Sequence, residues 1–456
     1  NGDYHAVTMA DAGLGPVLLL GLGWSFLARA GRPNRWALAL ALMFGLGAIL
    51  RTNSGSQLTS LVCFLALVRT LMLLRDHRSL RLCMVAGLLA AAASSLRHLN
   101  LPFPLLLLLA FLPGHFRQFG WRGVLRDGVV VGVSWLVFLA PWMAALYASN
   151  ATPIYPLIKG YHNPAFNFAM PTEGWRQIVE TLGGVMLQSQ IPAMLAVVPA
   201  ALLLARDRTV RNVQWAALAG AAIIVASFPA AAPLHMARYI QPTLATACFL
   251  ALMHLVGDGV LSSRVVRGAI AACVVLGLGH VAVVDVDLLW TEANHTRPLH
   301  YSRELIEERL AAYAEGQRQV PAGAPIFVYV SAPFGFDQGR NRILNADEPG
   351  PVSPPPGLPF FKGGEAVAAY LQSLGIRHVA FEDYDTAATW CISPAGIDTI
   401  VEPLWQPWKP YLFDLMANMR ELGRTRRVLY ASHGVWVVDL GEPVAQTRAG
   451  AALHIP

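Results

Sequence analysis

The chain has 456 residues, of which 55% are hydrophobic and only 14% are charged, and its mean hydropathy is +0.46. This composition excludes an ordinary soluble enzyme and indicates a membrane protein. The net charge of +6 comes almost entirely from arginines in short loops between apolar runs, which is a topology signal. Because no basic stripe with interleaved aromatics is present, we expect no nucleic-acid partner.

The long apolar runs lie between residues 13 and 285. A helix needs about 20 apolar residues to cross a bilayer. On that basis we predict an α-helical polytopic membrane protein with about ten transmembrane helices, at 13–28, 36–50, 57–74, 80–96, 100–113, 127–148, 183–205, 212–231, 238–256 and 266–285. The run at 101–113 is short, so it is either a tilted span or a re-entrant piece. The composition changes after residue 285, so we predict a multi-span domain at 1–285 and a second domain at 286–456.

Arginine is distributed unequally between alternate loops. The loops that are rich in arginine are 29–35, 75–81, 117–126, 206–211 and 264–267. The positive-inside rule places these loops in the cytoplasm. The N-terminus, the loop after Pro141 and the C-terminal domain are then extracytoplasmic. Because the composition is also typical of a GC-rich bacterium, we expect a multi-pass protein of the bacterial inner membrane.

Each predicted outer loop combines a cation with His, Asn or Tyr. Any one of these residues can be a simple interfacial anchor. Taken together, the cations suit a phosphate group and the amides and aromatics suit a sugar. The predicted phosphate-binding residues are Arg51, Arg97, Lys159 and Arg238, and the predicted substrate-cavity residues are Asn53, His98, Asn100, Tyr155, Tyr161, His162 and Tyr239.

Three stretches resemble the GT-C class of integral-membrane glycosyltransferases, which includes protein O-mannosyltransferases and lipid A aminoarabinose transferases. They are AGLLAAAASSLRHLNLPFPLLLLL at 86–109, PWMAALYASNATPIYPL at 141–157 and ARYIQPTLA at 237–245. The pattern extends over roughly residues 36–256. It departs from the family where Met143, Ala144 and Ala145 occupy the region that usually carries an arginine.

The resemblance implies transfer of a sugar from a polyprenyl-phosphate donor to a glycan, lipid or protein acceptor on the extracytoplasmic side of the bilayer. The family's catalytic acid follows its first helix. That helix is not evident in this sequence, so the base is either Asp3 or a residue upstream of Asn1. The alternatives are a polysaccharide polymerase or ligase that uses a pyrophosphate-linked lipid, and a non-catalytic protein that binds lipid-linked glycan.

Neither a metal nor a cofactor is expected. His5 and His162 are the candidate ligands, but no H-x-x-x-H motif or carboxylate pair accompanies them. The five cysteines contain no C-x-x-C pair, so neither a zinc site nor a disulfide framework follows from them.

The second domain alternates helical and strand patterns. We predict helices at 302–317, 365–375 and 408–422, strands at 324–332, 340–346 and 376–382, and a closing hairpin-like pair at 426–440. This order indicates a small α/β layer sandwich. The polar clusters at its strand ends predict either acceptor-glycan or cation binding, or simply solvated loops; they are Asp337, Arg340 and Asn341, then Asp347 and Glu348, then Glu382, Asp383 and Asp385.

Overall fold

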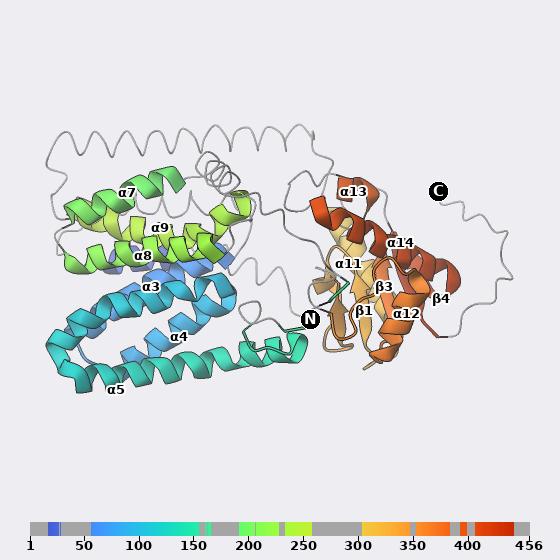
Figure 1. The fold of residues 1–456 in the computed structure, drawn as a ribbon, viewed down its shortest axis with the longest axis horizontal. Coiled ribbons are helices and arrows are strands. Elements are labelled where there is room, and N and C mark those ends of the chain that lie inside the picture. Colours follow the sequence, from blue (N-terminus) through green and yellow to red (C-terminus); the bar gives the residue numbers. More distant parts are fainter. Residues whose placement is uncertain are drawn as a thin grey trace. The chain divides into compact units, whose positions relative to one another are not determined.

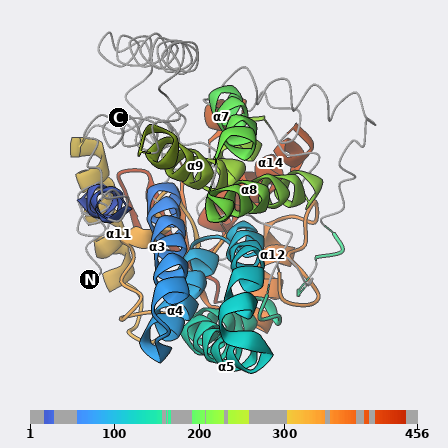
Figure 2. The same cartoon turned by 90° about the vertical axis from the view of Figure 1, so that its left-hand side faces the viewer.

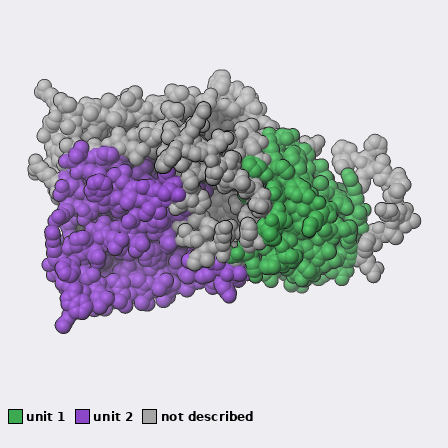
Figure 3. All heavy atoms as spheres, viewed as in Figure 1, with its two compact units in different colours: residues 1–2, 159–170, 289–456 green, residues 3–158, 171–288 purple. Residues whose placement is uncertain are grey.

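The structure is a computed structural model that divides into two compact units (Figure 3). It describes residues 17–26, 28, 56–154, 160–161, 163–165, 191–205, 207–227, 233–257, 303–346, 353–383, 393–398 and 406–441. One unit comprises residues 3–158 and 171–288, and we call it the helical unit. The other comprises residues 1–2, 159–170 and 289–456, and we call it the C-terminal unit.

The described part of the helical unit consists of apolar helices (Figure 1). Their bounds are α3 (Ser56–Asp76), α4 (Leu80–Leu96), α5 (Pro102–Asn150), α7 (Ile191–Leu204), α8 (Arg208–Ser227) and α9 (Pro233–Gly257). A short 3-10 turn, η2 (His98–Asn100), joins α4 to α5. These bounds confirm the predicted helices at 57–74, 80–96, 212–231 and 238–256 to within a few residues.

The structure does not support a count of about ten spans. Within the described ranges, three helices are long and apolar enough to cross a membrane: Gln57–Asp76, Pro102–Ser149 and Arg208–Ala226. Leu80–Leu96 and Val17–Phe26 are apolar but shorter. The predicted spans at 36–50 and 266–285 lie outside the described residues.

Helix α5 joins two of the predicted spans and contains a sharp reversal at Gly120. A straight helix of its length would extend about 70 Å, more than twice the thickness of a bilayer core. The backbone of Gly120 is non-helical (φ 65°, ψ 179°), in the region that glycine tolerates best. His115 and Asp127, which would lie about 18 Å apart along a straight helix, are in contact with Nε2 and Oδ2 separated by 2.9 Å. The predicted loop at 114–126 is therefore two helix ends around a one-residue turn.

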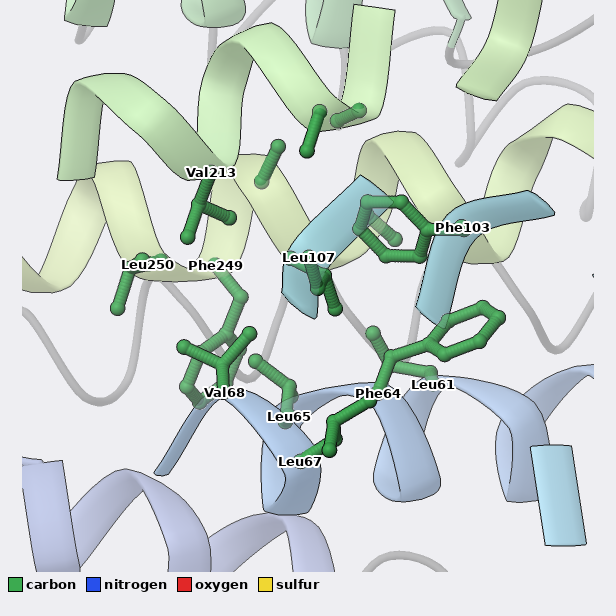
Figure 4. Close-up of a cluster of buried hydrophobic side chains, with 14 of the residues drawn as sticks. Leu61, Phe64, Leu65, Leu67, Val68, Phe103, Leu107, Val213, Phe249 and Leu250 are labelled. Atoms are coloured by element: carbon green, nitrogen blue, oxygen red, sulfur yellow. The ribbon is translucent and has the colours of Figure 1, made fainter. Parts of the chain in front are cut away.

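The two arms of α5 pack on different neighbours (Figure 2). In the first arm, Phe103 meets Phe64 of α3 edge-on with ring centroids 4.8 Å apart. Phe103 and Leu107 are fully buried beside Val213 and Phe249, which come from α8 and α9 (Figure 4). The second arm packs on α4 at Gly87, where an added Cβ would lie 2.5 Å from the carbonyl oxygen of Val131. Glycine is required there because the two backbones approach so closely.

The C-terminal unit contains a five-stranded sheet with the order β2-β1-β3-β5-β4. The strands are β1 (Ile326–Tyr329), β2 (Ile343–Asn345), β3 (His378–Glu382), β4 (Arg427–Ser432) and β5 (Val435–Asp439). β1 runs parallel to both β2 and β3, whereas β5 runs antiparallel to β3 and to β4.

Helices cover both faces of this sheet. The helices are α11 (Arg303–Arg318), α12 (Gly364–Ser373), α13 (Pro394–Asp398) and α14 (Lys409–Thr425), with short 3-10 turns η4 (Pro333–Gly335) and η5 (Gln406–Trp408). Alternate residues of β1 point to opposite faces: Ile326 and Val328 lie in a core with α11, and Phe327 and Tyr329 lie in a core with α12 and α14. The predicted α/β layer sandwich is confirmed, and each predicted helix and strand of this domain is found within a few residues of its expected place.

Candidate functional site

Two predicted site residues from distant parts of the sequence meet in the helical unit. The guanidinium carbon of Arg97 lies 5.3 Å from the centre of the Tyr239 ring. Arg97 follows the last residue of α4, and Tyr239 lies in the second turn of α9. Both side chains are half-buried. A guanidinium stacked on an aromatic face has a fixed orientation, so it can present its N–H donors to a phosphate without losing much further rotamer freedom.

Asn100 lies at the same end of the helices but serves packing. It is 2% exposed, and its Nδ2 donates to the Ser60 hydroxyl (2.9 Å) and to the carbonyl oxygen of Ala93 (3.0 Å). Both N–H donors of the amide are thereby used to join α3 to the end of α4. We therefore assign Asn100 to the support of the turn that carries Arg97, and not to contact with a substrate.

The other predicted site residues of the helical unit are not placed in this way. Asp3, Arg51, Asn53 and Tyr155 lie outside the described residues, as do Lys159 and His162 of the following loop. For His98 and Arg238 only the backbone is described, in η2 and in the second turn of α9 respectively. Arg238 is thus adjacent in sequence to Tyr239, and His98 is adjacent to Arg97.

Residues 159–170, the second part of the loop after α5, belong to the C-terminal unit. Asn163 is fully buried, and its Nδ2 donates to the carbonyl oxygen of Leu358 (2.9 Å), in the proline-rich segment. Its Oδ1 accepts from the backbone N–H of Ala165 (3.0 Å). Gly357 makes room for this amide: an added Cβ would lie 2.3 Å from Asn163 Oδ1. Tyr161, a predicted cavity residue, lies in the same loop and is half-buried.

The opposite end of the helices holds a charged cluster that the sequence did not suggest. Asp127, 4% exposed, accepts hydrogen bonds from Arg78 Nε (2.8 Å) and Arg126 Nε (3.1 Å) and contacts His115 Nε2 (2.9 Å). Arg78 also lies over the ring of Phe119, 5.3 Å from its centre. These contacts connect the start of α4 to the turn of α5. At this end, too, Arg75 Nη1 donates to the Thr209 hydroxyl of α8.

The contacts thus sort the predicted loops into two groups. Arg75, Arg78, Arg126 and Thr209 come from loops predicted to be cytoplasmic, and they gather at one end of the helices. Arg97, Asn100 and Tyr239 come from loops predicted to be extracytoplasmic, and they gather at the other.

The polar clusters of the C-terminal unit differ in kind. Asp337, Arg340 and Asn341 hold a loop in place: Asn341 Nδ2 donates to the carbonyl oxygens of Pro321 and Ala324 (both 2.8 Å). Glu382, by contrast, is buried (2% exposed) and not solvated as a loop acid would be. Asp383 pairs with Arg420 (2.6 Å). Asp347, Glu348 and Asp385 lie outside the described residues.

A surface hollow of about 630 Å³ lies at the amino end of β3, lined by Gln372, Gly375, Ile376, Arg377, Arg427, Asp439 and Gly441. Two hydrogen bonds from Arg377 (2.6 and 3.0 Å) hold the pKa of Asp439 below its usual range, while burial opposes this. Burial lowers the pKa of the neighbouring His378. Because Asp439 is already paired, this arrangement supports the structure of β3 and β5 and adds little net charge to the hollow.

No group of three or more His, Cys, Asp or Glu side chains with metal-binding geometry occurs in the described ranges. The chain matches no protein-family model, and it matches no curated protein.

Proposed function

We propose that the chain is a membrane glycosyltransferase that moves a sugar from a polyprenyl-phosphate donor to an acceptor outside the cytoplasmic membrane. The observation that carries this proposal is the stacking of Arg97 on Tyr239, two residues more than a hundred positions apart that the sequence predicts on the same side of the membrane. Three apolar helices long enough to cross a bilayer supply the membrane setting for such a donor.

A half-buried guanidinium suits the leaving group of this reaction. As the bond between the anomeric carbon and the donor phosphate breaks, negative charge accumulates on the phosphate. A cation held in advance beside that charge, where little water competes, stabilises the transition state far more than one in bulk water. We assign this role to Arg97, with Tyr239 as the residue that positions it. Lys159, Arg51 and Arg238 are proposed as further phosphate ligands from their predicted side of the membrane.

The new bond forms between an acceptor hydroxyl oxygen and the anomeric carbon. A carboxylate takes the hydroxyl proton, and the lipid keeps the phosphate, so atoms and charges balance without a cofactor. We propose that this carboxylate is Asp3 or a residue preceding Asn1, as the resemblance to GT-C enzymes implies.

The hydrogen bond between Asn163 and Leu358 supports the proposed topology. A hydrogen-bonded pair must lie on one side of a membrane, so the loop after α5 shares its side with the C-terminal unit. The arginine distribution assigns that side to the exterior of a bacterial inner membrane. The loop, which also contains Lys159, would then lie on the side to which Arg97 is assigned.

Donor binding tests the proposal. We expect the purified chain in lipid nanodiscs to bind a polyprenyl phosphate, and Arg97→Ala to weaken that binding by roughly tenfold, since one charge-assisted hydrogen bond contributes about 1.5 kcal/mol or more. Tyr239→Phe keeps the aromatic ring and should retain the affinity for polyprenyl phosphate. Tyr239→Leu removes the ring and should weaken the affinity almost as much as Arg97→Ala does. Equal affinities of the unmodified chain and Arg97→Ala would exclude Arg97 from the donor site.

A further inference from the structure

The parallel strands β1 and β3 end side by side at one edge of the C-terminal sheet. Tyr329 pairs with Phe381 in the register, so the next residues, Val330 and Glu382, and then Ser331 and Asp383, lie opposite one another. The chain leaves β1 for β2 on one side and later returns to β3 on the other. In open α/β sheets, ligands bind at the carboxyl ends of the strands where the strand order reverses in this way.

A buried network supports an exposed serine at this edge. Glu382 accepts hydrogen bonds from the Ser331 backbone N–H and hydroxyl (both 3.0 Å) and from the Tyr313 hydroxyl. Burial, and then the adjacent Glu382 carboxylate, raise the pKa of Tyr313, so this phenol keeps its proton and remains a donor. Ser331 itself is exposed. The buried Glu382 thus fixes the position of Ser331, while the residue remains accessible to solvent.

An exposed aromatic ring follows directly, in η4. Phe334 is 47% exposed, although large apolar side chains favour burial. The turn that carries it is packed closely on α11: a Cβ added at Gly335 would lie 2.6 Å from Leu310 and 2.7 Å from Tyr313. Phe336, two residues on, stacks on Tyr313 with ring centroids 5.1 Å apart. The turn that carries Phe334 is therefore held closely against α11.

The charged side chains that the structure describes at this edge pair with one another. Asp383, which lies opposite Ser331, receives hydrogen bonds from Arg420, with Nε 2.7 Å from Oδ1. Both side chains are about 30% exposed, so the pair presents acceptors and donors but no net charge. Buried Glu382 lies near Arg309, whose Nη1 contacts the Ser331 hydroxyl (3.4 Å). Among the described residues of this edge, the two carboxylates are therefore matched by two guanidinium groups.

We propose that this edge, formed by Ser331, Phe334, Asp383 and Arg420, binds a neutral saccharide. An aromatic ring covers the apolar face of a sugar, and neighbouring hydroxyl, carboxylate and guanidinium groups hydrogen-bond to its hydroxyls. The assignment of this saccharide as the acceptor of the transfer reaction rests on the proposed function, whereas saccharide binding does not.

Saturation-transfer NMR on the full chain in detergent, with maltotetraose and chitotetraose as probes, tests the inference. We expect transfer signals from at least one probe, reduced at least fivefold by Phe334→Ala and lowered by Ser331→Ala. Phe361→Ala is the matched control, because Phe361 is also exposed (59%) but lies just before α12, and it should leave the signals unchanged.

Three outcomes would overturn the inference: no signal from either probe, equal signals in Phe334→Ala and Phe361→Ala, or displacement of the probe by inorganic phosphate, which would indicate an anion site. Failure of sugar transfer with intact saccharide binding would contradict the proposed function alone. Transfer without saccharide binding would contradict this inference alone.

Discussion

Removal of the Asp127 carboxylate should destabilise the helical unit strongly, because three cationic or potentially cationic side chains converge on it. Arg78 is the main partner, with hydrogen bonds of 2.8 and 3.3 Å and a side chain 29% exposed. Arg126 is 54% exposed, and exposed pairs contribute little. Breaking a buried ion pair costs about 3–5 kcal/mol, and since Arg78 can regain some water, we expect a loss of about 2–3 kcal/mol for Asp127→Ala.

The assay is the free energy of unfolding of the full chain in mixed micelles, followed by the helical circular-dichroism signal. Asp76→Ala is the matched control, because Asp76 lies at the same end of the helices but is 34% exposed and 3.8 Å from Arg75. We expect it to change the free energy by less than about 0.5 kcal/mol. Similar losses in the two variants, or none in Asp127→Ala, would refute the assignment of Asp127 as the connection between α4 and the α5 turn.

Three further predictions concern packing, chain path and pH. Gly87→Ala should lower the free energy of unfolding by about 1–3 kcal/mol, because the added Cβ would overlap the backbone of α5. Gly132→Ala is the control and should leave this free energy unchanged, because no atom lies within 4 Å of the added Cβ. Equal effects of the two substitutions would contradict the close approach of α4 and α5. The distance between spin labels at residues 112 and 129 should be well below the value of about 26 Å for a straight helix. A measured distance of about 26 Å would exclude the reversal at Gly120. Because the pKa of Asp439 is lowered in the fold, its contribution to stability is present above its unfolded pKa and is lost in acid. Asp439→Asn should therefore show a smaller loss of thermal stability between about pH 6 and about pH 3 than the unmodified chain, and an unchanged loss would contradict this role.

The elements of the C-terminal unit were predictable because their patterns are local. Residues 326–329 and 379–381 are short apolar runs, and 365–375 has the helical period and ends at a glycine. The parallel pairing of β1 with β3 was not predicted, because it joins segments about fifty residues apart. The burial of Glu382 follows from that pairing, so a strand-end residue that was expected either to bind a ligand or to be solvated became the centre of a network.

For the helical unit, the sequence predicted which loops gather at the same end of the helices, but it did not predict how the chain turns at Gly120. Arginines at 117, 122 and 126 suggested a loop, yet a helix end at a membrane surface accommodates such side chains equally well. The contacts of Asp127 with Arg78 and of Asn163 with Leu358 join residues 49 and 195 positions apart. No local pattern encodes such pairs. The sequence predicted Arg97 and Tyr239 in one outward-facing cavity, but it did not predict that the two side chains stack.

A sugar-transfer assay measures the proposed transferase activity and the role of Arg97 in one experiment. The chain is reconstituted in proteoliposomes with a radiolabelled polyprenyl-phosphate sugar and a membrane extract as the source of acceptor, and the release of polyprenyl phosphate is measured. We predict that Arg97→Ala lowers turnover on the order of 10²-fold, whereas Arg122→Ala, at the opposite end of the helices, leaves it unchanged. Turnover that is equal in the two variants, or absent from the unmodified chain, would contradict the proposed transferase activity or the role of Arg97 in it.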